Sequence, residues 1–222
     1  MLSTPDSRVD PDKVYEPAED TFLLLDVLES EKEYIQQRLG NSPLVTEIGT
    51  GSGVVTTFIR QHIVPNGYFM PTDVNFYACT TCTETWEANG MKNDHLDPIR
   101  CNLVSALRVP VDLMVFNPPY VPSEDGDIEL PESDDDPRWV DIALVGGHDG
   151  MRITNQLLGQ LKEKLSLEGI AYILFCKRNH PEAVAQSLIK DGWNVERIEE
   201  RKAGWEVLSV YKITHPSSHP SG

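Results

Sequence analysis

The sequence predicts an α/β fold, in which a doubly wound, mostly parallel sheet carries helices on both faces. Short apolar runs alternate with segments of helical periodicity along most of the 222 residues. A glycine-rich turn directly follows the first apolar run, as expected where a buried parallel strand leads into a helix. The runs 193–200 and 206–213 alternate in polarity across Ala203-Gly204, so they predict a final antiparallel pair that makes the sheet mixed.

Each element is predicted from its own pattern. The expected order is helix 18–28, helix 31–39, strand 44–48, helix 53–62, strand 68–72, helix 76–89, weak strand 98–103, strand 111–116, helix 149–165, strand 170–176 and helix 181–190, before the final pair. Pro71 lies inside strand 68–72 and has no N–H to donate to a sheet. We therefore expect that strand to bulge or break near Pro71.

A single domain over residues 14–213 accounts for these elements. The polar segment 1–13 contains two prolines and predicts a flexible N-terminal arm, and we expect 214–222 to form a disordered tail. No apolar run is long enough to span a membrane, and no secretory signal is recognisable. An intracellular, reducing compartment is therefore expected.

The chain is acidic, because 35 Asp and Glu against 19 Lys and Arg give a formal net charge of −16. Binding to phosphate backbones normally requires a basic surface, so we expect no direct binding to nucleic acids. Cys79 and Cys82 form a C-x-x-C on a predicted helix, but no further metal ligands accompany them. We interpret both as small core residues and expect no metal site.

A glycine-rich turn after strand 44–48 is the first candidate binding site. Gly49, Gly51 and Gly53 follow the acid Glu47, and glycine lets a backbone turn tightly and approach a ligand closely. A dinucleotide fingerprint would place its third glycine at position 54, which is Val54 here. An acid beside the loop repels a pyrophosphate but attracts the α-ammonium group of a methionine moiety. The turn therefore favours S-adenosylmethionine (SAM) over NAD.

Asp73 lies 20 residues after Gly53, at the end of the next predicted strand. A carboxylate in this position can accept hydrogen bonds from both hydroxyls of a ribose. Either feature alone is equally well explained by a solvated aspartate or an ordinary glycine turn. Their occurrence on adjacent elements favours a cofactor site.

Asn117-Pro118-Pro119-Tyr120 directly follows strand 111–116, where ligands of open α/β sheets bind. The two prolines stiffen this loop and remove two N–H donors. The Asn117 side-chain oxygen and the Pro118 carbonyl are then acceptors for the two hydrogens of an NH₂ group, and Tyr120 can stack on the flat group that carries it. The loop predicts methylation of a planar amide or amine nitrogen by positioning, without a dedicated base. A rigid turn after a strand is the alternative.

The motifs resemble those of the eukaryotic and archaeal HemK-like glutamine methyltransferases, which modify the glutamine of the GGQ loop in class-1 peptide-chain release factors. The resemblance covers about residues 12–213 and includes the stretches 14–25, 73–75, 146–150 and 203–209. It implies the Rossmann-like fold of class I SAM-dependent methyltransferases. The implied SAM site consists of Thr21, Glu47, Gly49, Asp73, Asn102, Leu103 and Asn117, with substrate contacts along Asn117, Pro118, Pro119 and Tyr120.

Two positions have alternatives to these implied roles. Thr21 is also explained as an early residue of helix 18–28. Asn102 stands where the family usually has an aspartate that accepts a hydrogen bond from the adenine amino group. Asparagine keeps one acceptor oxygen, so we expect SAM binding to survive with lower affinity.

The resemblance also implies partners. These are a small zinc-binding activator subunit, which forms a heterodimer and covers a sheet edge near 98–103, and a class-1 release factor as substrate, in complex with its GTPase partner. A location in the cytoplasm and the nucleus is expected for such a protein.

Other interpretations stay open. The same tetrapeptide serves amino-methylation of adenine in DNA, but the net charge argues against DNA, and methylation of a protein lysine is a further alternative. A decayed, non-catalytic binding module is the second alternative, and the intact motifs argue against it. The acidic loop Ser123–Pro137 either forms a lid that contacts basic residues of the substrate or is a mobile solvated segment.

Overall fold

The computed structural model describes residues 2–123 and 129–216. Its strands are β1 (Leu44–Ile48), β2 (Tyr68–Phe69), β3 (Thr72–Asp73), β4 (Ile99–Arg100), β5 (Val111–Phe116), β6 (Leu165–Cys176), β7 (Asn194–Ala203) and β8 (Glu206–Thr214). Its helices are α1 (Glu19–Ser30), α2 (Lys32–Arg38), α3 (Val54–Phe58), α4 (Phe76–Ala88), α5 (Arg138–Ile142), α6 (Arg152–Leu158), α7 (Leu161–Lys164) and α8 (Pro181–Lys190). A π-helical turn, Ile59–Ile63, continues α3.

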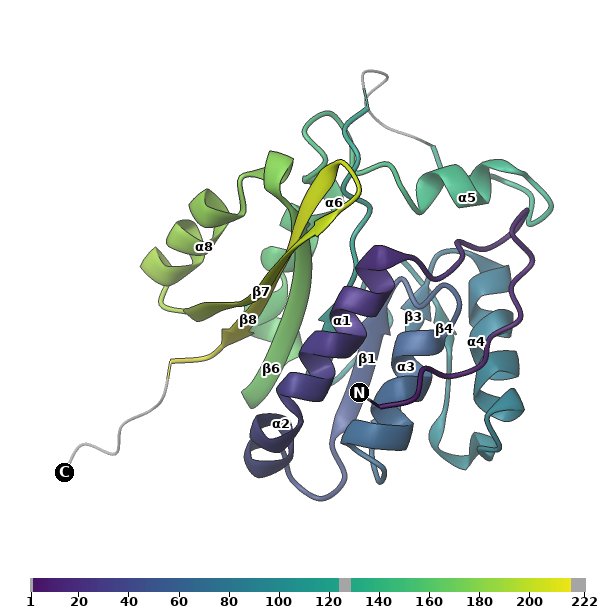
Figure 1. The fold of residues 1–222 in the computed structure, drawn as a ribbon, viewed down its shortest axis with the longest axis horizontal. Coiled ribbons are helices and arrows are strands. Elements are labelled where there is room, and N and C mark those ends of the chain that lie inside the picture. Colours follow the sequence, from purple (N-terminus) through teal and green to yellow (C-terminus); the bar gives the residue numbers. More distant parts are fainter. Residues whose placement is uncertain (1, 124–128, 217–222) are drawn as a thin grey trace.

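One mixed sheet organises the described part of the chain, in the order β4-β3-β1-β5-β6-β8-β7, with β2 paired to β1 (Figure 1). The pairs from β4 through β6 are parallel. β8 is antiparallel to both β6 and β7. The predicted α/β class, with its antiparallel final pair, is therefore confirmed. Because the chain moves from β1 to β3 on one side and later to β5 and β6 on the other, the sheet has its switch point between β1 and β5.

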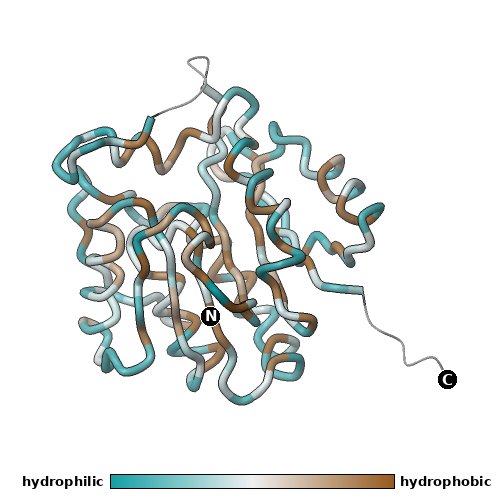
Figure 2. The backbone as a smooth tube through the Cα atoms, turned by 180° about the vertical axis from the view of Figure 1, so that it is seen from behind, coloured by the Kyte–Doolittle hydropathy of each residue, from teal (hydrophilic) through white to brown (hydrophobic). Residues whose placement is uncertain are grey.

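Two apolar layers cover the two faces of the sheet. Consecutive residues of β6 alternate between them, so that Tyr172 packs with α1, α3 and α4 while Ile173 packs with α6, α7 and α8. Hydrophobic segments gather in the interior, and the outer loops are mostly hydrophilic (Figure 2). This layering fixes the strand ends that carry the polar motifs.

Pro71 divides the predicted strand 68–72 into β2 and β3, which confirms the expected break. Met70 still donates its N–H to the Val45 carbonyl at 2.9 Å, and the Pro71 carbonyl accepts from the Ile99 N–H at 2.8 Å. Pro71 therefore takes part in the sheet only as an acceptor, because it has no N–H to donate.

The predicted helix 149–165 is wrong in extent. Gly159 and Gln160 separate α6 from α7, and the Gln160 N–H bonds to the Leu157 carbonyl at a spacing of three residues, which ends the α-helical pattern. β6 then begins at Leu165, five residues before the predicted strand 170–176. Glycine favours a helix less than any residue except proline, and α6 ends directly before Gly159.

The N-terminal arm contains no helix or strand, but residues 2–13 lie against the domain (Figure 1). Asn89 exchanges two hydrogen bonds with the Asp6 backbone, at 3.1 and 2.8 Å. The Asn75 side chain donates to the Lys13 carbonyl at 2.7 Å. The flexibility proposed for 1–13 stays a prediction, and residues 217–222 of the predicted tail lie outside the described residues.

Candidate active site

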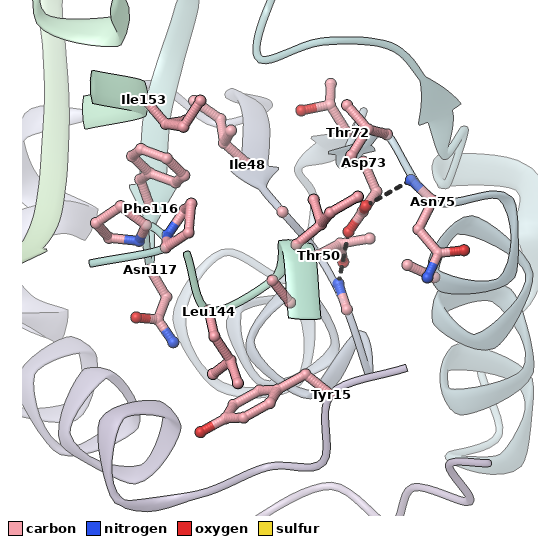
Figure 3. A pocket seen from close by; sticks show the side chains of 18 of the residues that line it. Tyr15, Ile48, Thr50, Thr72, Asp73, Asn75, Phe116, Asn117, Leu144 and Ile153 are labelled. Atoms are coloured by element: carbon pink, nitrogen blue, oxygen red, sulfur yellow. Dashed lines mark hydrogen bonds between the residues drawn. The ribbon is translucent and has the colours of Figure 1, made fainter. Parts of the chain in front are cut away.

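A cavity of about 180 Å³ opens at the carboxyl ends of β1, β3 and β5, at the switch point of the sheet. Ligands of open α/β sheets bind in this place. Figure 3 shows Asp73 and Asn117 on opposite sides of the cavity, with Thr50 of the glycine turn between them. The loop that contains Asn117 and the strand end that contains Asp73 therefore face each other across one cavity, and the glycine turn lies between them.

The glycine turn has a backbone that other residues rarely adopt. Gly49, Gly51 and Gly53 have φ angles of +66°, +48° and +73°. A Cβ on Gly53 would lie 2.6 Å from the Cα of Cys82, whereas a Cβ on Gly49 would meet nothing within 4 Å. Gly53 therefore serves the packing of α4, and Gly49 leaves its side open to the cavity. Cys82 is buried in this contact, consistent with the predicted core role.

Glu47 is a buried carboxylate, with 5 % of its surface exposed. Its Oε2 accepts hydrogen bonds from the Thr56 N–H at 2.9 Å and from the hydroxyls of Thr50 and Thr56. All three donors reach Oε2 and none reaches Oε1. Burial raises the pKa of Glu47 to about 7, although the three hydrogen bonds oppose the shift. The site thus contains a carboxyl group whose ionised form a bound cation would stabilise.

Asp73 connects the glycine turn to the loop after β3. Its Oδ2 accepts from the Gly51 N–H at 3.1 Å and its Oδ1 accepts from the Asn75 N–H at 2.9 Å, as the dashed lines in Figure 3 show. Burial raises the pKa of Asp73, and the backbone hydrogen bonds oppose that shift. Asp73 lies across the turn from Glu47, on the neighbouring strand.

Asn117 lines the cavity and has an unsatisfied acceptor atom. Its Nδ2 donates to Asp20 Oδ2 at 3.0 Å. Its Oδ1 is buried and has no hydrogen-bond partner among the described residues. Buried polar atoms are normally paired, and an unpaired one needs a functional explanation. Pro118 is buried directly beside it and lines the same cavity.

Tyr120 lines the cavity and is held in place by Glu206. Its hydroxyl donates to Glu206 Oε2 at 3.0 Å, and Glu206 also pairs with Arg178 at 3.2 Å. Burial, together with the nearby carboxylates of Asp20 and Glu206, raises the pKa of Tyr120. Tyr15 stands near the same carboxylates, and burial is the main cause that raises its pKa to about 12. Both phenols are therefore neutral donors at physiological pH.

Two glycines brace the tetrapeptide from behind. A Cβ on Gly146 would lie 2.4 Å from the Pro119 carbonyl oxygen, and one on Gly150 would lie 2.2 Å from the Tyr120 carbonyl oxygen. Asn179 also donates to the Tyr120 carbonyl, at 3.2 Å. Only a residue without a side chain fits at either position, so the 146–150 segment fixes the path of the loop.

An outer wall closes the cavity on the side of α5. Trp139 is buried, and its indole N–H donates to the Ser133 carbonyl at 3.0 Å. Asp134 pairs with Arg100 at 2.7 Å, and Asp135 accepts from the Tyr77 hydroxyl at 2.7 Å. The remaining wall residues are Leu130, Ile142, Ala143, Leu144 and Val145.

Comparisons with known proteins agree with this geometry. Residues 19–131 match the family model described as "Methyltransferase small domain". The chain is 36 % identical to the eRF1 methyltransferase catalytic subunit mtq2 of Schizosaccharomyces pombe, over 96 % of both chains. It is 35 % identical to Methyltransferase HEMK2 of Homo sapiens, over 90 % of this chain and 89 % of the human one. The chain belongs to the family of HemK-like methyltransferases.

A solved structure supports the same family. The Mtq2–Trm112 complex of E. cuniculi, described as responsible for methylation of the eRF1 translation termination factor, superposes with a TM-score of 0.66 at 26 % identity. The match covers 91 % of this methyltransferase and 99 % of that chain. The class I methyltransferase fold predicted from the resemblance is therefore confirmed.

The structure brings all the predicted site residues of the methyltransferase to one cavity. They are Thr21, Glu47, Gly49, Gly51, Asp73, Asn102, Leu103, Asn117, Pro118, Pro119 and Tyr120. Thr21 also has the alternative role, because its hydroxyl accepts from the Ala18 N–H at 3.3 Å at the start of α1. Their individual contacts with ligands stay predictions.

Sequence reasoning missed Tyr15, Asp20 and the outer wall. Tyr15 and Asp20 lie in the stretch 14–25 that carries the resemblance, but acids are common in the first turn of any helix, so Asp20 gives no separate signal.

Within the acidic loop, Asp134 and Asp135 bind residues of this chain. The lid hypothesis stays a prediction, and residues 124–128 lie outside the described residues. In the part of the chain that the structure describes, no helix could cross a membrane.

Proposed function

We propose that this methyltransferase transfers the methyl group of SAM to the side-chain amide nitrogen of the glutamine in the GGQ motif of a eukaryotic class-1 release factor. One observation carries the proposal: Asn117, which lines the same cavity as Glu47 and Asp73, has a buried side-chain oxygen without a hydrogen-bond partner among the described residues. An acceptor in this place matches a substrate that offers N–H groups. The resemblance to the eRF1 methyltransferase catalytic subunit supports the choice of glutamine.

The residues around the glycine turn fit SAM. Glu47 has an acceptor oxygen that none of its three donors uses, which suits the α-ammonium group. Asp73, at the end of β3, would hold the ribose hydroxyls, and Asn102 and Leu103 line the side where an adenine would lie. SAM supplies an electrophilic methyl group on a sulfonium sulfur.

The residues of the tetrapeptide hold the acceptor nitrogen. Asn117 Oδ1 and the Pro118 carbonyl would accept its two N–H groups, which fixes the nitrogen and increases its electron density. Tyr120, fixed by Glu206, would cover the flat amide. The nitrogen becomes acidic once it is methylated, so its proton leaves to water and no dedicated base is needed.

Mass spectrometry of the release factor after incubation with SAM tests the function. A gain of one methyl group on the GGQ glutamine is expected, and Asn117→Ala should reduce the rate at least about 100-fold. Asn93→Ala is the matched control, because Asn93 is exposed and does not line the cavity. A methyl group found on a protein lysine or on DNA adenine, with the glutamine unmodified, would contradict the proposal.

The partners belong to the same proposal. A small zinc-binding activator of the Trm112 type would form a heterodimer along β4, which is an edge of the described sheet. The similar E. cuniculi structure is a complex of Mtq2 with Trm112. The release factor would be recognised together with its GTPase partner, in the cytoplasm and the nucleus. Co-expression with the activator should increase the soluble yield, and methylation should be faster when the GTPase partner is added. An unchanged yield and rate would reject both partners.

A further inference from the structure

The Asn117 amide can chemically serve the reaction in only one of its two orientations. Its oxygen must point into the cavity, because a nitrogen there would place its own N–H groups against those of an NH₂ substrate. In the structure Oδ1 is the buried, unpartnered atom and Nδ2 is bonded to Asp20. The two orientations have nearly the same shape, so packing alone does not choose between them. A polar partner has to make the choice.

We propose that Asp20 is a positioning residue that holds the Asn117 amide with its oxygen toward the acceptor nitrogen. An ionised carboxylate only accepts hydrogen bonds, so only the NH₂ end of Asn117 can face it. The Nδ2–Oδ2 distance of 3.0 Å makes this bond direct. The inference rests on the proposed function, because it assigns a role within the same site.

Asp20 is itself fixed in place, which a positioning residue requires. Only 5 % of its surface is exposed. Its other oxygen, Oδ1, accepts from the Thr21 N–H at 2.7 Å, in the first turn of α1, where a negative charge is favourable. Oδ1 also accepts from the Thr21 hydroxyl at 3.4 Å, and the Tyr15 hydroxyl is a further donor to this carboxylate. Asp20 is thus held from its own helix and from the segment before it, while Oδ2 accepts from the loop after β5.

This arrangement makes the isosteric variant more harmful than a truncation. In Asp20→Asn, the side-chain oxygen would stay with the Thr21 N–H, so the new NH₂ group would face Asn117. The Asn117 amide would then reverse to accept that hydrogen bond, and its own NH₂ group would point into the cavity. In Asp20→Ala, no group forces either orientation, so the substrate can still select the useful one. A purely structural role predicts the opposite order, because asparagine preserves the volume of aspartate.

A double variant restores the arrangement with the roles exchanged. In Asp20→Asn/Asn117→Asp, the new amide donates to one carboxylate oxygen of residue 117, and the other oxygen again faces the substrate nitrogen. Glu19→Gln is the matched control, because it removes an exposed carboxylate from the same turn of α1. All variants are assayed as the full chain with its activator, using the release factor and SAM.

The expected result is a kcat about 100-fold lower in Asp20→Asn, with SAM affinity within about threefold of the unsubstituted protein. Asp20→Ala should be more active than Asp20→Asn, and the double variant about tenfold more active than Asp20→Asn. Glu19→Gln should keep the original kcat. Thermal melting confirms that each variant is folded.

Two results would overturn the inference. The first is an Asp20→Asn variant with the original kcat, and the second is a double variant no more active than Asp20→Asn although both are folded. The proposed function is judged separately, by whether the unsubstituted protein methylates the glutamine. Activity on another NH₂ substrate would reject the substrate and still allow the orientation of Asn117 to be tested.

Discussion

The raised pKa of Glu47 predicts that SAM binding weakens as the pH falls from 8 to 6. The ammonium group of the ligand favours the ionised carboxylate, and burial holds the pKa of that carboxyl at about 7 in the free protein. The ionised fraction is then about 0.9 at pH 8 and about 0.1 at pH 6. Since only this fraction binds well, the Kd at pH 6 should be about ten times the Kd at pH 8.

The sign follows from proton linkage. The free protein binds a proton on Glu47 below pH 7, while the complex holds the residue ionised, so binding must release that proton. S-adenosylhomocysteine carries the same ammonium group and is a stable ligand for calorimetry. Titrations in buffers of different ionisation enthalpy should count about 0.9 protons released at pH 6 and about 0.1 at pH 8.

Two variants separate the causes of this dependence. Glu47→Gln should bind more weakly than the unsubstituted protein at pH 8. Its own Kd should be the same at pH 6 as at pH 8, because glutamine cannot ionise. Asp73 is the other carboxyl of the cavity with a raised pKa, so Asp73→Asn should keep the proton release if Glu47 is its source. A constant Kd from pH 6 to pH 8 in the unsubstituted protein, without proton release, would refute the reasoning.

Three further substitutions test the frame of the site. Gly53→Ala should lower the free energy of unfolding by at least about 1–3 kcal/mol, because Gly53 has a φ of +73° and the new Cβ would lie 2.6 Å from Cys82 Cα. An unchanged midpoint in guanidinium titrations would contradict this. Gly150→Ala should lower kcat more than SAM affinity, since it displaces the Tyr120 carbonyl, and equal losses of both would argue otherwise. Trp205→Ala should change stability by less than about 0.5 kcal/mol in the same titrations, because Trp205 is 100 % exposed, and a larger loss would reveal a hidden contact.

The sheet and the two motif loops could be predicted because their signals are local. A buried parallel strand reads as an apolar run, and a turn at its end needs particular residues such as Gly49 or Pro118. The break at Pro71 followed from a missing N–H group in the same way. These predictions depended on single segments and on the rule that ligands bind at strand ends.

The remaining features depend on contacts between distant segments. The bond from Asn117 to Asp20 spans 97 residues, and the bond from Tyr120 to Glu206 spans 86. No periodic pattern in the sequence predicts such long-range pairs. Trp139 lies after the predicted acidic loop Ser123–Pro137, in a segment for which no element was predicted. Its burial in α5 depends on packing that the local sequence does not show.

The close fit of Gly146 and Gly150 behind the tetrapeptide has a consequence for how this enzyme family can diversify. Neither the loop nor its support can change alone, because any side chain at either glycine would collide with a carbonyl of the loop. New acceptor specificity is therefore more accessible through the outer wall, where Leu130 and Leu144 have exposed surface. Laboratory evolution toward a different NH₂ substrate should accumulate changes there and leave the nitrogen-holding loop intact.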